Sequence, residues 1–175
     1  IRVKSAKEMI ADLNGGQDRI AELESEIKSV KANLLTVAKK LTASRVSAAT
    51  KLSEGVSTEI AGLSMPHTRF YADVIAPDYA GALKESDFTI TGCDEIVMSI
   101  QAHRDGPKVA LGKGASGGEM SRIMLALEVV IAASAPVGTY IFDEVDAGVG
   151  GKAAIEVGRR LHALSQHAQV IVVTH

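Results

Sequence analysis

Near its carboxyl end the chain reads Thr139-Tyr140-Ile141-Phe142-Asp143-Glu144-Val145-Asp146-Ala147-Gly148-Val149-Gly150-Gly151, and these residues set the architecture around them. The first four are β-prone or apolar, and two carboxylates follow directly. This pattern predicts a buried strand that ends at Asp143 and Glu144. Open α/β sheets bind ligands at that end of their strands. The pair therefore indicates either simple strand-end solvation or a site that holds Mg²⁺ and polarises an attacking water.

A second strand is predicted at Val170–Val173, after a helix from about Gly151 to Ser165. All-apolar strands that alternate with helices indicate parallel strands covered on both faces, so the fold class is α/β. His175 follows the second strand, one βα unit beyond the carboxylates. Its imidazole is expected to reach a γ-phosphate or the attacking water, with a structural role as the alternative.

A glycine-rich helix start precedes the first strand at Ser116-Gly117-Gly118-Glu119. Ser116 and Glu119 have the spacing of a capping box, and the two glycines leave the first turn without side chains. Exposed backbone amides at the positive end of a helix suit a phosphate. Both readings, a cap alone and a phosphate contact, remain open on this pattern.

The amino-terminal part has a different periodicity. Apolar residues alternate in steps of three and four for about three heptads, which predicts a coiled-coil seam. The seam consists of Ile20, Leu23, Ile27, Val30, Leu34, Val37 and Leu41. Pro66 ends the helical pattern, so the arm is expected to span residues 1–64, with a joint at Gly15 and Gly16. A single amphipathic helix needs a partner, which must lie outside this sequence.

Between the arm and the α/β part, three short β-prone segments are separated by glycine and proline. They lie at Thr68–Ile75, Asp87–Thr91 and Glu95–Gln101. This arrangement predicts a small antiparallel hairpin or meander.

The composition excludes several classes of protein. Lys and Arg total 19 against 21 Asp and Glu, so net charge gives no sign of nucleic-acid binding. The lone Cys93 excludes an internal disulfide framework. No apolar run is long enough to span a bilayer, and no signal peptide is recognisable. A soluble, cytoplasmic protein is expected.

In this order, the motifs resemble the signature motif, Walker B, D-loop and H-loop of ABC ATPases. Residues 115–122 and 143–151 are similar to the RecN family of SMC-like ABC ATPases in particular. The resemblance implies that residues 65–175 form the C-terminal lobe of an ABC-type ATPase head, with a parallel sheet, helices and a small antiparallel part. Residues 1–64 would be the returning helix of a long coiled-coil arm.

The resemblance also implies residue roles and partners. Asp143 would hold Mg²⁺ directly or through water, Glu144 would be the general base and His175 the γ-phosphate sensor. Ser116, Gly117, Gly118 and Glu119 would make the signature contact, and Asp146 would belong to a D-loop that crosses a dimer interface. The implied cofactors are ATP and Mg²⁺. The implied partners are a second head of the same protein and DNA, in double-strand-break repair in the bacterial cytosol and nucleoid.

The chain contains no Walker A loop of the form G-x-x-x-x-G-K-[ST]. In the resembled family this loop lies in an N-terminal half, so the chain is expected to be a C-terminal part that does not hydrolyse ATP alone. A transporter nucleotide-binding subunit would carry the loop and lack the heptad arm. A purely structural coiled-coil protein would leave Asp143, Glu144 and the Ser116 helix start without a purpose.

Overall fold

The structure is a computed structural model that describes residues 2–81, 83–113, 115–132, 134 and 137–174. Within the first helix, side chains are described at residue 16 and from residue 18 onward. The chain forms two compact units, residues 1–43 with 77–93, and residues 44–76 with 94–175. The helices in the described part of the chain are all too short or too polar to span a membrane. The division into an arm, 1–64, and a lobe, 65–175, stays a prediction.

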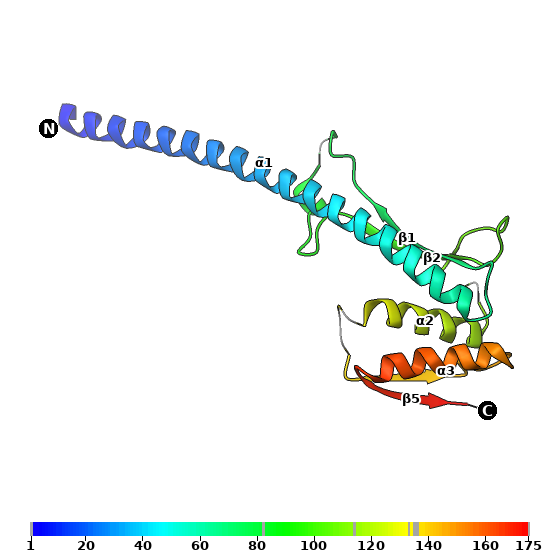
Figure 1. The fold of residues 1–175 in the computed structure, drawn as a ribbon. Coiled ribbons are helices and arrows are strands. Elements are labelled where there is room, and N and C mark those ends of the chain that lie inside the picture. Colours follow the sequence, from blue (N-terminus) through cyan, green and yellow to red (C-terminus); the bar gives the residue numbers. More distant parts are fainter. Residues whose placement is uncertain (1, 82, 114, 133, 135–136, 175) are drawn as a thin grey trace. The chain divides into compact units, whose positions relative to one another are not determined.

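The first helix, α1, runs from Arg2 to Gly62 and contributes to both units (Figure 1). It continues through Gly15 and Gly16, so the predicted joint there is wrong. Two glycines cost a helix only about 1 kcal/mol each, which a long helix tolerates. The predicted seam is solvent-exposed: its seven side chains retain between 36% and 62% of their accessible surface. Among the described residues, no second helix covers this seam, although Leu34 borders a hollow that Leu83 and Phe88 also line.

In the first unit, residues 77–93 fold back against α1. The Tyr79 hydroxyl lies 2.5 Å from Thr42 Oγ1, and Lys39 Nζ stands 5.7 Å from the centre of the Tyr79 ring. A short 3₁₀ helix, η1, spans Glu85–Asp87, and Glu85 pairs with Lys31 at 3.3 Å. The strand predicted at 87–91 is therefore wrong, since this segment forms η1 and a tight turn instead.

The second unit contains the predicted antiparallel sheet. Its strands are β1 (Arg69–Ile75), β2 (Glu95–Gln101) and β3 (Val109–Ala110), in the order β1-β2-β3. Phe70 pairs with Ile100, and both side chains are almost fully buried. An ion pair of 3.1 Å between Arg45 and the buried Asp94 side chain joins α1 to the residue before β2.

Serines of α1 cover the open edge of β1. The Phe70 N–H donates to Ser57 Oγ at 3.0 Å, and the Ala72 N–H donates to Ser53 Oγ at 2.9 Å. The Ser57 hydroxyl in turn donates to the Phe70 carbonyl. An edge strand normally exposes these groups, and here a helix satisfies them.

The remaining elements are α2 (Gly117–Ile131), β4 (Thr139–Asp143), α3 (Lys152–Ser165) and β5 (Gln169–Val173). β4 and β5 pair in parallel, with Asp143 opposite Val173, which confirms the predicted βαβ unit. Both helices pack against one face of this pair (Figure 1). Tyr140 and Phe142 point into that core, as do Val145 and Leu164.

The prediction that both faces of these strands are covered is wrong for the described residues. Burial along β4 alternates, with Tyr140 and Phe142 buried while Ile141 is 69% exposed. On β5, Ile171 and Val173 are likewise exposed. The open face is apolar, although an exposed sheet face normally carries polar residues. The composition of this face is typical of a buried sheet surface, although nothing in the described part of the chain packs against it.

Candidate functional site

The site begins where β4 ends. The Asp143 side chain is exposed, and Glu144 adopts φ of 54°, a left-handed conformation that is uncommon outside glycine. The Glu144 N–H donates to the Val173 carbonyl at the end of β5, at 3.1 Å. Backbone conformations of this kind cluster at functional sites.

A compact turn follows the carboxylates. The Ala147 N–H donates to the Glu144 carbonyl at 3.0 Å, and the Val149 N–H donates to the Asp146 carbonyl at 3.2 Å. Gly148 has φ of 71°, which explains a glycine there. Asp146 lies half-buried within this turn.

The helix start at Ser116 has the predicted cap. The Ser116 N–H donates to Glu119 Oε2 at 3.0 Å, and the Glu119 N–H donates to Ser116 Oγ at 3.4 Å. The Ser116 backbone hydrogen bond, together with its hydroxyl and the nearby Arg122 guanidinium, holds the pKa of Glu119 below its usual value. The capping interpretation is confirmed, and Gly117 remains exposed at the start of α2.

The structure brings the helix start and the carboxylates together. A Cβ placed on Gly117 would lie 3.1 Å from Glu144 Oε2, and one on Gly118 would lie 3.1 Å from the Glu144 carbonyl. The glycines therefore allow the first turn of α2 to contact the turn at Glu144. Sequence reasoning treated the two motifs separately and missed this contact.

Two further residues of α2 hold this contact in place. Ser121 Oγ donates to the Asp143 carbonyl, and Arg122 Nη1 donates to the Ala147 carbonyl at 2.8 Å. Arg122 is only 6% exposed, and its burial lowers the pKa of its guanidinium. Neither residue was predicted, although an arginine inside an otherwise apolar helical stripe was a usable signal.

The donor set suits a metal ion that arrives with a nucleotide. Within the described ranges, no three His, Cys, Asp or Glu side chains cluster to hold a metal. Mg²⁺ in nucleotide sites uses one or two carboxylates together with substrate phosphates. Asp143, exposed at a strand end beside Glu144, fits that requirement. The predicted third member, His175, lies outside the described residues.

Comparison with known proteins gives consistent relatives. The DNA repair protein RecN of Streptomyces coelicolor is 44% identical over 155 residues, which cover 86% of this chain and 27% of that protein. RecN of Mycobacterium leprae is 38% identical over 98% of this chain and 31% of its own length. The chain thus spans less than a third of these curated relatives. No family model matches the sequence.

One solved structure shares the fold. The Smc head domain with an extended coiled coil from Pyrococcus furiosus, bound to the C-terminal domain of ScpA, has a TM-score of 0.57. The match covers 91% of this chain and 37% of that one at 17% identity. The match shows that this chain shares its fold with part of that structure.

Proposed function

Because the chain belongs to the RecN family, we propose that it supplies the Walker B carboxylates and the signature helix of an SMC-like ATPase head. In the complete protein, two such heads bind and hydrolyse ATP between them. The turnover drives the action of the arms on DNA in double-strand-break repair in the cytosol.

One observation carries this proposal. The start of α2 contacts the turn at Glu144, so the predicted signature and the predicted catalytic carboxylates share one exposed edge of the unit. If two copies face each other across that edge, the Ser116 helix start of one lies near the carboxylates of the other. A composite site of this kind needs both sets of groups on a common surface.

Each group then has a role set by its chemistry. Asp143 would ligate Mg²⁺, which neutralises charge on the phosphates. Glu144 would accept a proton from the attacking water, after its side chain turns away from Gly117. His175 would contact the γ-phosphate. Ser116, Gly117 and Gly118 would bind the phosphates held by the opposite head, and Asp146 would lie in the D-loop at the interface.

The open face of β4 and β5 supports the proposal that another part of the head packs against it. Ile141, Ile171 and Val173 are exposed there, although they are typical of a sheet covered on both sides. A further portion of the protein, with the Walker A loop that this chain lacks, would cover this face and seat the nucleotide. The exposed heptad seam requires a partner helix for the same reason.

The test is ATP turnover by the complete protein, with and without DNA. Glu144→Gln removes the proposed base but keeps the size of the side chain. We expect turnover to fall by at least about 100-fold, the lower range for loss of a general base, while ATP-dependent dimers accumulate. Glu95→Gln, at an exposed position at the start of β2, is the matched control. Unchanged turnover in Glu144→Gln would overturn the assignment.

A second variant tests the signature separately. Ser116→Arg places a bulky cation at the helix start, and we expect ATP-dependent dimerisation to be lost, as measured by light scattering. Ser165→Arg, exposed at the end of α3, should dimerise normally. Dimerisation of Ser116→Arg at the wild-type ATP concentration would remove Ser116 from the proposed interface.

A further inference from the structure

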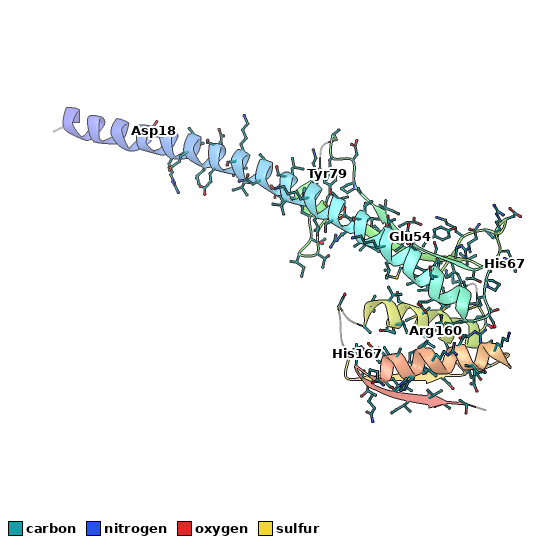
Figure 2. All side chains as sticks on the ribbon, in the orientation of Figure 1. Asp18, Glu54, His67, Tyr79, Arg160 and His167 are labelled. Carbon is teal, nitrogen blue, oxygen red and sulfur yellow. The ribbon has the colours of Figure 1, made fainter. Side chains whose placement is uncertain are left out.

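Arg160, labelled in Figure 2, lies on α3 and binds Glu59 near the end of α1. Residues 53–62 of α1 are called the base of the arm. The Arg160 Nε donates to Glu59 Oε2 of α1 at 2.6 Å, and its Nη1 donates to Glu156 Oε2 of α3 at 2.8 Å. The Arg160 side chain is 16% exposed, while its partners Glu59 and Glu156 retain 29% and 34%, so the contact is partly shielded from water. Partly shielded, charge-assisted hydrogen bonds are stronger than fully exposed ion pairs.

Gly62, the last residue of α1, provides the space for this contact. A Cβ on Gly62 would overlap Nη2 of Arg160 and would also approach its Cζ to 3.1 Å. The absence of a side chain at Gly62 therefore allows the guanidinium to lie directly against the end of α1. The bonded Glu59 lies one turn earlier on the same helix.

Both ends of this connection are fixed to other elements. α3 starts at Lys152, immediately after the turn that begins at Asp143 and Glu144. On the arm side, Ser53 and Ser57 bind β1, so the base of α1 is attached to the antiparallel sheet. A displacement of α3 relative to that sheet must therefore either strain or break the contacts of Arg160.

We propose that Arg160 is a positioning residue that couples the turn at residues 143–151 to the arm. Through Glu59 it fixes α3 to the base of α1, so a nucleotide-dependent shift of that turn reaches the arm helix. The coupling rests on the proposed function, because a nucleotide must act on the turn. The anchoring contact itself does not depend on that function.

Hydrogen exchange of the complete protein tests both statements. The background is Glu144→Gln, and samples are compared with and without ATP and Mg²⁺. Without nucleotide, we expect Arg160→Gln to speed exchange at amides 58–62 about tenfold, because a hydrogen bond to a charged group is lost. With nucleotide, the change at 58–62 should disappear in this variant, while the change at 146–151 remains.

Two further variants sharpen the result. Arg159→Gln makes the same charge change, but Arg159 is 71% exposed and pairs only within α3 in the contacts described, so it should behave as the parent. Gly62→Ala displaces the guanidinium without altering any charge and should reproduce Arg160→Gln.

The outcomes distinguish two claims: the anchor, which is the contact of Arg160 with Glu59, and the coupling of that contact to nucleotide. Unchanged exchange at 58–62 without nucleotide in both Arg160→Gln and Gly62→Ala would overturn the anchor. A nucleotide response at 58–62 that survives in both variants would overturn the coupling. If the background protein shows no nucleotide response at 146–151, the proposed function and the coupling fail together, while the nucleotide-free comparison still decides the anchor.

Discussion

Gly118 of α2 lies against Ala147 of the turn after β4: a Cβ on Gly118 would stand 2.9 Å from the Ala147 Cβ. The same atom would lie 3.1 Å from the Glu144 carbonyl oxygen and 3.2 Å from the Ala147 carbonyl oxygen. Two of these three neighbours are backbone atoms, which cannot rotate away. The helix start therefore fits the turn only when residue 118 has no side chain.

We predict that Gly118→Ala destabilises the chain by roughly 1–3 kcal/mol, the usual cost of overpacking. Gly158→Ala is the matched control, because Gly158 lies inside α3 with nothing within 4 Å of an added Cβ. It should stabilise the chain by up to about 1 kcal/mol through helix propensity. Urea denaturation measures both, and the same sign for both substitutions would contradict the close approach.

The cap of α2 should depend on pH. The pKa of Glu119 lies below its usual value, mainly because the Ser116 N–H binds its carboxylate. Its contribution to the free energy of unfolding is therefore present above about pH 4.5, and is lost as the pH falls through the lower folded-state pKa. Glu119→Ala should cost roughly 1 kcal/mol near neutral pH and progressively less in acid. An equal loss of stability near neutral pH and in acid would show that the charge of the Glu119 carboxylate does not stabilise the cap.

The effect of Gly62→Ala on the free energy of unfolding should have opposite signs in the wild-type chain and in an Arg160→Gln background. In the wild-type chain the new methyl group displaces Arg160 and breaks its bond to Glu59, so we expect a net loss of stability. In an Arg160→Gln background no such bond exists, and the helix propensity of alanine should give a gain of about 0.5–1 kcal/mol. Thermal unfolding of the four proteins in this double-mutant cycle provides the measurement. Additive effects would show that the two residues do not interact.

The effect of Ile141→Thr on the free energy of unfolding should differ between this chain and the complete protein. In the chain Ile141 is 69% exposed, so the change in unfolding free energy should stay within about 0.5 kcal/mol. If the rest of the head covers this face, the same substitution buries a hydroxyl and should cost about 1–3 kcal/mol in the complete protein. Equal effects in both proteins would mean that the face stays open.

The regular elements of the second unit could be predicted because period and turn chemistry agree. The strand expected at Glu95–Gln101 has these bounds in the structure, and the helix expected from Ser116 begins there. In both places the local sequence pattern and the tertiary packing favour the same conformation. The parallel pairing of β4 with β5 followed from the same agreement.

The strand expected at 87–91 failed because side chains satisfied the backbone locally. The Asp87 carboxylate accepts from the Lys84 N–H, and Thr89 Oγ1 donates to the Gly92 carbonyl. These bonds close a 3₁₀ turn and a tight turn in place of a ladder. The β-propensity of Phe88 and Ile90 could not reveal this competition.

The candidate site was only partly predictable. The capping box of Ser116 and Glu119 follows from spacing alone, and the structure confirms it. The contact of α2 with the turn at Glu144 depends on tertiary packing, which residue spacing does not encode. For that reason Ser121 and Arg122, which hold the contact, were absent from the predicted site.

The serines that cover the edge of β1 also limit how the arm can move. Ser53 and Ser57 stand about 6 Å apart along a helix, and the N–H groups of Phe70 and Ala72 repeat about every 6.6 Å along a strand. The two spacings nearly match, so both bonds form together. An axial slide of α1 by one residue, about 1.5 Å, would lengthen and misalign both bonds at once. A shift by one helical turn would place Ala49 or Ala61 opposite one of the two N–H groups, so only one bond could form again. The two serines therefore select a single register of α1 on this sheet.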